Sequence, residues 1–312
     1  MSEKLSIPLT DMTTAAPCCG DDCCGGEKAG VTSATAVAAQ PAAVLAADAD
    51  PRAMVREKYG AVAEGGSCGC GCCQSTPDDD AMLAALGYTA EQRAAIPAGA
   101  DLGLGCGNPL AHAALKPGET VLDLGSGAGI DCFLAARELG PTGRVIGVDM
   151  TAAMLERARA NATKVADASE PGERYENVEF RLGEIEHLPV ADASVDAIIS
   201  NCVVNLSPDK PQVFREALRV LKPGGRLVVS DLVLARELGD ELRRNVNLYV
   251  GCVAGASLKD EYLRLIRDAG FHDVQVVEEH GYEVGMQNLP AGSPERDAFS
   301  AVTSVKVRAI KA

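Results

Sequence analysis

The sequence lacks an excess of basic residues, and this absence argues against nucleic acids as partners. Its 312 residues carry 29 Lys and Arg against 44 Asp and Glu, which gives a net charge of −15. Proteins that bind nucleic acids carry basic patches that meet the phosphates. We therefore expect no nucleic-acid partner, and we expect the acidic surface only to keep the chain in solution.

Long apolar runs are absent as well. No stretch reaches the roughly 18 apolar residues that a membrane helix needs, and the first residues lack a basic flank followed by an apolar stretch. We expect neither a membrane span nor a secretory leader. With 47% hydrophobic and 23% charged residues, the composition is that of a globular protein with a sizeable core. The sequence thus predicts a cytoplasmic protein, which we expect to be a monomer.

Histidine is scarce while cysteine is abundant. There are 4 His and 12 Cys, and no His lies within five residues of a Cys. A mixed Cys/His zinc finger is therefore disfavoured. In a cytoplasmic chain, so many cysteines indicate metal binding or catalysis more than a disulfide framework.

Composition divides the chain into four predicted parts. Residues 1–50 form a Cys- and Ala-rich tail that we expect to be disordered. Residues 51–115 form an N-terminal extension or lid, with an amphipathic segment and the cluster CGCGCC. Residues 116–234 form the cofactor-binding core, and residues 235–312 supply a further site segment and the last strands.

The core alternates short apolar strands with helices of i, i+3, i+4 spacing, which predicts an α/β fold with a doubly wound, mainly parallel sheet and right-handed crossovers. Ser207 and Pro208 predict the start of one of these helices. A later helix is expected at 258–269, followed by an antiparallel pair of strands. The five core strands and the two later ones are expected at 121–124, 145–148, 178–181, 195–200, 226–230, 274–277 and 303–310.

A glycine-rich turn follows the first predicted strand. The segment VLDLGSGAGID, residues 121–131, offers a close backbone approach and the free N–H groups of a helix start. Asp149 ends the second predicted strand, where its carboxylate can accept both ribose hydroxyls of an adenosine; a solvated strand-end Asp is the alternative. The glycine pattern is GxGxG and not GxGxxG, which argues against a dinucleotide.

Together with LGEIEHLP at 182–189 and LKPGG at 221–225, this segment resembles the class I S-adenosylmethionine (SAM) methyltransferases over about 119–231. The resemblance implies a Rossmann-like, seven-stranded sheet with an N-terminal lid and a small C-terminal region. It also implies a cofactor site with three parts. The residues expected to hold the cofactor are Asp123, Gly125, Ser126, Gly127 and Gly129 at the methionine end, Asp149 and Met150 at the ribose, Gly183, Glu184 and Ile185 at the adenine, and Asn201 near the methyl group.

The methyl acceptor is a separate question. The fourth predicted strand runs into ISNCVVNLSPDK, so Asn201 and Cys202 would face the sulfonium methyl at the carboxyl end of the sheet. Cys106 and Cys252 lie 96 and 50 residues from Cys202, and only the fold could bring the three together. Three thiolates without a fourth ligand suit a soft, three-coordinate ion such as trivalent arsenic. A structural role for these cysteines, and a plain backbone-bonding role for Asn201 and Asn205, are the alternatives.

The GCG turn at 105–107, GVDMT at 147–151, ISNCVVNLSPDK and GCVAGA at 251–256 together resemble the arsenite methyltransferase family, over about 51–277. The resemblance implies that Cys106, Cys202 and Cys252 hold As(III) during one to three methylations from SAM. It further implies an upstream redox cysteine and a thiol reductant such as thioredoxin or glutathione. That cysteine lies among Cys68, Cys70, Cys72 and Cys73, with Cys72 or Cys73 preferred.

The chain departs from the family pattern at two places. Leu104 stands where the family often has a Tyr before the GCG turn, so an aromatic contact to the cofactor is missing there. The segment CCGDDCC, with Cys18, Cys19, Cys23 and Cys24, is additional and is either a second arsenic-binding segment or a tail.

Two other functions stay open at this point. One is a SAM methyltransferase of a small organic molecule, such as a quinone precursor, with incidental cysteines. The other is a thiolate-rich protein that sequesters arsenite without catalysis, although sequestration alone needs neither the glycine loop nor Asp149.

Overall fold

The computed structural model describes residues 44–46, 49–65, 79–163, 175–282 and 289–312. Most of the predicted tail, and the cysteines at 18–24 and 68–73, lie outside these residues. The expected disorder is wrong for 44–46, because Val44 forms a β-bridge with Asn245 and the N–H of Leu45 donates to the carbonyl of Arg244 at 2.8 Å. Residues 42–312 form one compact unit. No helix in the described ranges has both the length and the apolar character needed to span a bilayer.

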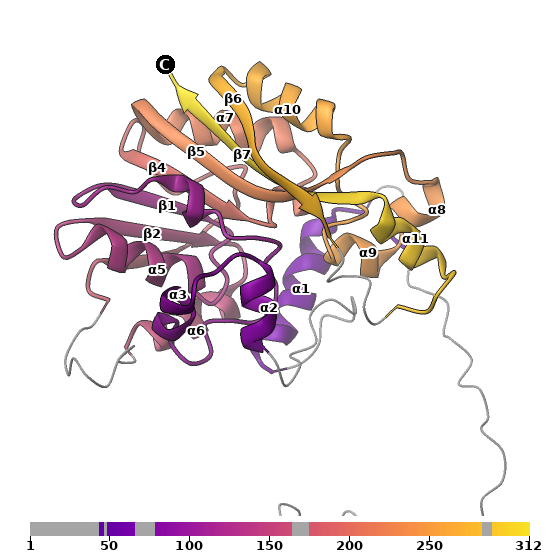
Figure 1. The fold of residues 1–312 in the computed structure, drawn as a ribbon, viewed down its shortest axis with the longest axis horizontal. Helices are drawn as coiled ribbons and strands as arrows, with labels where there is room; N and C mark the ends of the chain where they lie inside the picture. The colour runs from indigo at the N-terminus through magenta and orange to yellow at the C-terminus, as the bar shows by residue number, and fades with distance from the viewer. Residues whose placement is uncertain (1–43, 47–48, 66–78, 164–174, 283–288) are drawn as a thin grey trace, which may run out of the picture. The chain divides into compact units, whose positions relative to one another are not determined.

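A seven-stranded sheet in the order β3-β2-β1-β4-β5-β7-β6 forms the centre of this unit (Figure 1). The pairs among β1 to β5 are parallel, and β7 pairs antiparallel with both β5 and β6. The predicted mixed sheet with a late antiparallel pair is confirmed. The strands are β1 (Thr120–Leu124), β2 (Arg144–Asp149), β3 (Val178–Leu182), β4 (Val195–Asn201), β5 (Leu221–Leu234), β6 (Phe271–Gly281) and β7 (Val302–Lys311).

Helices cover both faces of the sheet because successive strand residues point to opposite sides. In β1, Val121 belongs to the apolar cluster shared with α5 and α6, whereas Leu122 belongs to the cluster shared with α7 and α10. The helices are α1 (Pro51–Ala63), α2 (Asp79–Ala85), α3 (Ala90–Ala95), α4 (Leu110–Ala113), α5 (Ile130–Leu139), α6 (Ala152–Ala162), α7 (Lys210–Val220), α8 (Asp240–Arg243), α9 (Val246–Val250), α10 (Lys259–Asp268) and α11 (Pro294–Ser300), with a 3₁₀ turn η1 (Val204–Leu206).

The start of α7 differs from the prediction. The helix begins at Lys210, and the carboxylate of Asp209 caps it by accepting the N–H of Gln212 at 3.0 Å. The hydroxyl of Ser207 instead accepts the N–H of Asp209 and donates to the buried Glu186. Pro211, not Pro208, occupies the first turn. Tertiary bonding of Ser207 thus shifts the cap by two residues.

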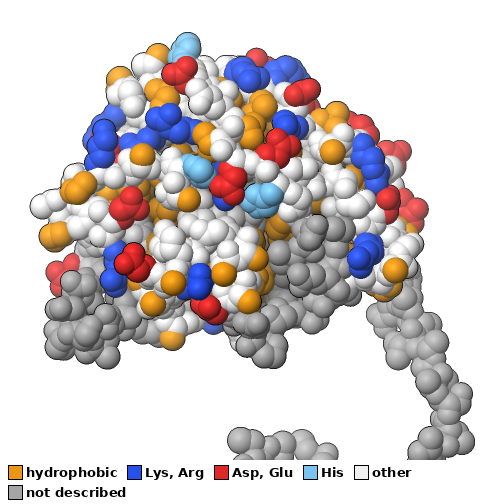
Figure 2. All heavy atoms as spheres, in the orientation of Figure 1, with side chains coloured by type: hydrophobic (Ala, Val, Ile, Leu, Met, Phe, Trp, Pro, Cys, Tyr) orange, Lys and Arg blue, Asp and Glu red, His pale blue; other side chains and the backbone are white. Residues whose placement is uncertain are grey.

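The charges on the face shown in Figure 2 are mixed in sign. Lys and Arg side chains alternate there with Asp and Glu, so the negative excess does not gather on this face. The chain order reverses between β1 and β4, since β2 lies on one side of β1 and β4 on the other. In open α/β sheets, ligands bind beyond the carboxyl ends of the strands at such a reversal. A ligand site is therefore expected at the carboxyl ends of β1, β2 and β4.

Candidate active site

A pocket enclosing about 1150 Å³, open solvent included, lies at the carboxyl ends of these strands. Its walls come from the loop after β1, the ends of β2 and β4, the turn after β3, and α1. Of the residues predicted to hold a cofactor, those that line it are Asp123, Gly125, Ser126, Gly127, Asp149, Met150, Gly183, Ile185 and Asn201. Gly129 and the side chain of Glu184 do not line it.

The loop after β1 presents bare backbone to this pocket. Gly125, Gly127 and Gly129 have φ angles of +67°, +52° and +98°, which side chains rarely tolerate. A Cβ on Gly125 would lie 2.4 Å from Val203, whereas a Cβ on Gly127 would meet nothing within 4 Å. The hydroxyl of Ser126 is buried in the loop and has no hydrogen-bond partner among the described residues. The loop therefore offers both space and an unused polar group to a ligand.

Asp149 holds this loop from the end of β2. Its carboxylate accepts the N–H of Gly127 at 3.0 Å and the N–H of Thr151 at 2.8 Å. Burial raises the pKa of Asp149 above its usual value, and the hydrogen bonds from the two backbone N–H groups offset only part of this rise. Each carboxylate oxygen can accept a further hydrogen bond, which leaves capacity for ligand hydroxyls.

Glu184 turns its side chain toward α1. Its carboxylate pairs with Arg52 at 2.7 Å and with Arg56 at 3.0 Å. Arg52, Val55 and Tyr59 of α1 line the pocket, so these ion pairs fasten α1 over it. The first helix of the predicted 51–115 extension is thus held to the turn after β3, and the carboxylate of Glu184 contacts α1.

Two buried carboxylates lie at the other end of the pocket. Asp123 accepts a hydrogen bond from the thiol of Cys132 at 3.2 Å, and burial raises its pKa well above the usual value. Burial also raises the pKa of Asp131, to about 6. The hydroxyl of Tyr88 donates to Asp131 at 2.8 Å. Such a pair can receive a cationic group such as an ammonium.

Three predicted cysteines meet beside this pocket. Cys106, Cys202 and Cys252 are 0%, 8% and 2% exposed, and they come from the loop before α4, the end of β4 and the turn after α9. The thiol of Cys252 donates to the carbonyl of Cys202 at 2.9 Å. Hydrogen bonding to the thiols of Cys106 and Cys252, together with burial, raises the pKa of Cys202 well above its usual value. All three thiols are thus in one cluster, and Cys202 borders the pocket.

The backbone is strained at two of these cysteines. Cys202 and Cys252 have φ angles of +58° and +63°, in the left-handed region that favours glycine. The N–H of Cys202 donates to the carbonyl of Ser230 at 2.8 Å, which fixes this kink at the end of β4. Strained residues of this kind gather at functional sites, because elsewhere selection replaces them.

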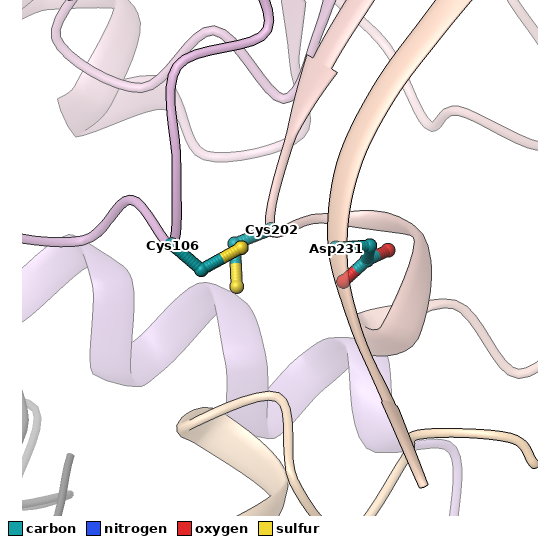
Figure 3. A group of neighbouring side chains, drawn as sticks. All are labelled: Cys106, Cys202 and Asp231. Atoms are coloured by element: carbon teal, nitrogen blue, oxygen red, sulfur yellow. The ribbon is translucent and has the colours of Figure 1, made fainter. Parts of the chain in front are cut away.

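Asp231 is a neighbour of the thiols that local sequence patterns do not reveal. Its carboxylate and the sulfur atoms of Cys106 and Cys202 lie within 4.8 Å of one another. Figure 3 shows the three side chains as neighbours. The side chains of Asn205 and Tyr262 donate to this carboxylate at 2.8 Å and 3.1 Å. Burial raises the pKa of Asp231 to about 7. The amide nitrogen of Asn205 also donates to the carbonyl of Leu232 at 2.6 Å, so this side chain bonds both to Asp231 and to the backbone.

Asn201 holds the turn that carries Cys106. Its side-chain oxygen accepts the N–H of Cys106 at 3.1 Å, and its amide nitrogen donates to the carbonyl of Gly107 at 2.8 Å. The hydroxyl of Ser304 on β7 donates to the carbonyl of Cys106 at 2.9 Å. Leu104 lines the pocket just before this turn.

Comparisons with known proteins agree with this geometry. A family model described as a methyltransferase domain matches residues 115–270. An arsenite methyltransferase of Halobacterium salinarum is 51% identical over 246 residues, which are 74% of this chain and 61% of that protein. The arsenite methyltransferase of Aquipseudomonas alcaligenes is 49% identical over 178 residues, or 56% and 50% of the two chains.

Among solved structures, the crystal structure of an arsenic (III) S-adenosylmethionine methyltransferase from Chlamydomonas reinhardtii superposes with a TM-score of 0.57. It is 37% identical and covers 76% of this chain and 75% of its own. The chain belongs to the arsenite methyltransferase family. The resemblance inferred from the motifs is thereby confirmed. The chain spans between half and two thirds of the two curated relatives, so its own activity is a matter for proposal and test.

Proposed function

We propose that this protein transfers methyl groups from SAM to trivalent arsenic held by Cys106, Cys202 and Cys252. The observation that carries the proposal is the convergence of three cysteines, 96 and 50 residues apart, on one cluster beside the pocket. A structural role would not require three clustered, buried thiols of which one lines a ligand pocket and two lie on strained backbone.

The pocket residues fit SAM at each of its parts. The acidic pair Asp123 and Asp131 would receive the ammonium of the methionine end, and the free hydroxyl of Ser126 would receive its carboxylate. Asp149 would accept the ribose hydroxyls. Gly183 and Ile185 would contact the adenine. When bound, SAM supplies a methyl group on a positively charged sulfonium, and Asn201 and Cys202, which line the pocket, would face that methyl group.

The thiols fit arsenic even though the pKa values of Cys106 and Cys202 are raised, by burial in the first case and by hydrogen bonding together with burial in the second. Arsenite is present in water as a neutral trihydroxide. When a thiol replaces one hydroxide, the thiol proton and the hydroxide leave together as water, so no base is consumed. The raised pKa of Cys106 and Cys202 therefore disfavours bare thiolates and does not oppose formation of arsenic–sulfur bonds. Three sulfur ligands leave the lone pair of arsenic free.

Methyl transfer then changes the oxidation state of arsenic. The lone pair forms the bond to the methyl carbon, the carbon–sulfur bond of the sulfonium breaks, and arsenic is oxidised from the trivalent to the pentavalent state. Return to the trivalent state needs two electrons, which two thiols supply by forming one disulfide. We propose Cys72 or Cys73, outside the described residues, as a source of these electrons, and thioredoxin or glutathione as the final reductant.

The protein contributes by positioning the methyl donor and the acceptor and by excluding water from the site. Holding donor and acceptor in contact makes the transfer intramolecular, and exclusion of water preserves the attraction between the sulfonium and nearby dipoles. A reaction that needs reduced thiols also favours the cytoplasm.

The test is methylation of arsenic by the purified chain. We expect mono-, di- or trimethylated arsenic when the protein is incubated with SAM, arsenite and a thiol reductant, as measured by chromatography with element-specific mass spectrometry. Cys202→Ser should lower the rate at least 100-fold. Cys132→Ser is the matched control, because it also replaces a buried thiol, keeps a donor toward Asp123 and leaves the cluster intact.

Unchanged activity of Cys202→Ser would overturn the role of the cluster. Binding of SAM without any methylated arsenic would instead favour a small-molecule methyltransferase. Tight retention of arsenite without SAM binding would favour a sequestering protein.

A further inference from the structure

The amide nitrogen of Asn201 has more acceptors than hydrogens. It lies 2.8 Å from the carbonyl of Gly107, 3.0 Å from a carboxylate oxygen of Asp131 and 3.1 Å from the hydroxyl oxygen of Tyr88. An Asn side chain has two N–H hydrogens. At least two of the three acceptors must therefore share one hydrogen, which weakens each of those bonds.

This amide joins the two parts of the active site. On one side, Asp131 and Tyr88 line the cofactor pocket, and the hydroxyl of Tyr88 donates to the other oxygen of Asp131. On the other side, the oxygen of the same amide accepts the N–H of Cys106, while its nitrogen holds the carbonyl of Gly107. The orientation of one side chain thus decides how firmly the turn bearing Cys106 is held.

We propose that the Asn201 amide couples occupancy of the methionine end of the cofactor pocket to the position of Cys106, so that cofactor binding tightens arsenic binding. The inference rests on the proposed function. An ammonium group that pairs with Asp131 competes with the Asn201 amide for this carboxylate and weakens its hold on the amide hydrogen. The two amide hydrogens then serve Gly107 and Tyr88 more fully, and the Cys106 turn is held more firmly.

Tyr88 is a positioning residue in this scheme, and its removal should imitate the cofactor. In Tyr88→Phe the ring still fills its buried site, but the hydroxyl acceptor is gone. Two acceptors then remain for two hydrogens before any cofactor binds. Arsenite affinity should therefore be at least that of the unchanged protein, and the cofactor should add nothing to it.

Two adenosine compounds separate this coupling from general pocket filling. S-Adenosylhomocysteine has the amino-acid end and cannot donate a methyl group, whereas 5′-methylthioadenosine lacks the amino-acid end. We expect the first to tighten arsenite binding about fivefold or more, within the usual range of coupling between sites. The second should leave the arsenite affinity unchanged.

The measurement is equilibrium dialysis of the full-length chain against arsenite, with arsenic counted by element-specific mass spectrometry. Arsenic retained by the Cys202→Ser form of each variant is subtracted, because the other cysteines also bind arsenic. Tyr175→Phe is the matched control, since it removes a hydroxyl that donates to the carbonyl of Ala95 away from the thiols. This control should keep the full effect of S-adenosylhomocysteine.

Equal effects of the two adenosine compounds on the unchanged protein would overturn the inference without use of any variant. A full effect of S-adenosylhomocysteine in Tyr88→Phe would overturn it as well. Both results leave the proposed function intact, provided that the unchanged protein methylates arsenic. Absence of Cys202-dependent arsenite binding would defeat the proposed function itself.

Discussion

At the scale of single residues, Gly107 shows how tightly the Cys106 turn is packed against the sheet. A Cβ at this position would lie 2.2 Å from the hydroxyl oxygen of Ser230 and 3.1 Å from the side chain of Lys306. We predict that Gly107→Ala displaces the turn and lowers the free energy of unfolding by about 1–3 kcal/mol, as overpacking does. Arsenic methylation, measured by product formation, should fall at least tenfold. Urea unfolding measures the loss of stability.

Ser230 supplies the control for this prediction. Its hydroxyl is buried without a partner among the described residues, so Ser230→Ala alone should leave stability and activity nearly unchanged. In the double variant the new methyl group no longer meets the hydroxyl, and most of the lost activity should return. If the double variant is as inactive as Gly107→Ala, the steric explanation is wrong.

The same residues show what local sequence could and could not predict about the site. The glycine loop, Asp131 and Asp149 lie within one strand–loop–helix–strand unit, so Gly125, Gly127 and Asp149 could be placed in the pocket from their spacing along the chain. Tyr88 and Asp231 reach the site only through long-range packing. Tyr88 lies 43 residues from its partner Asp131, and no motif links the two. The three cysteines could be grouped only through an expected fold, because 96 and 50 residues separate Cys106 and Cys252 from Cys202.

At the scale of elements, α1 is held over the pocket by charge. Arg52 and Arg56 both pair with Glu184, and all three side chains are partly exposed, at 27%, 41% and 32%. Partly exposed pairs contribute about 0–1 kcal/mol each and weaken with salt. We predict that Glu184→Gln weakens S-adenosylhomocysteine binding two- to fivefold, as measured by titration calorimetry at low salt.

Salt distinguishes this explanation from a direct contact of Glu184 with the cofactor. Affinity of the unchanged protein should fall toward that of Glu184→Gln as salt is raised, while the variant should change little. Asp80→Asn, which removes the exposed pair with Arg93, should behave like the unchanged protein. A difference between Glu184→Gln and the unchanged protein that persists at high salt would contradict the role of the ion pairs.

The presence of each strand was more predictable from the sequence than the residues at which it begins and ends. Every predicted strand of the sheet is present, because apolar runs bounded by Gly and Pro are local signals. β5 extends from Leu221 to Leu234, beyond the predicted 226–230. At its start a register shift in β4 accommodates the turn at 222–225, and at its end pairing with β7 continues the strand past Ser230. This extension carries Asp231 to the thiols. Pairing with neighbours decides such extensions, and one strand read alone does not show them.

At the scale of the whole molecule, three buried aspartates and the half-buried Asp149 make stability depend on pH. Burial raises the pKa of Asp123, Asp131, Asp149 and Asp231, that of Asp131 to about 6 and that of Asp231 to about 7. Their ordinary value is 3.8. Above it the unfolded chain loses protons that the folded chain still binds. The stability that these groups contribute is therefore full below about pH 4 and is lost as pH rises through their folded values.

Carboxylates with lowered pKa values have the opposite effect, but in another pH range. Arg181 and Arg144 hold the pKa of Glu179 at about 2, so its contribution is present above its ordinary value and is lost only as pH falls toward 2. Above about pH 5 such groups are ionised in both the folded and the unfolded chain, so they no longer contribute to the change of stability with pH. Between pH 5 and pH 8 the buried aspartates decide the slope, and the growing net negative charge acts in the same direction.

We predict that the melting temperature of the ligand-free protein falls from pH 5 to pH 8, and that Asp231→Asn flattens this fall. A pKa raised from 3.8 to about 7 corresponds to a loss on the order of 4 kcal/mol across the titration. Asparagine keeps the shape of the side chain and cannot titrate. The measurement is thermal unfolding at pH 5, 6, 7 and 8, followed by circular dichroism. Asp192→Asn removes an equal charge from an exposed side chain, 77% accessible, and should run parallel to the unchanged protein; an Asp231→Asn curve with that same slope would show that Asp231 is ionised in both states.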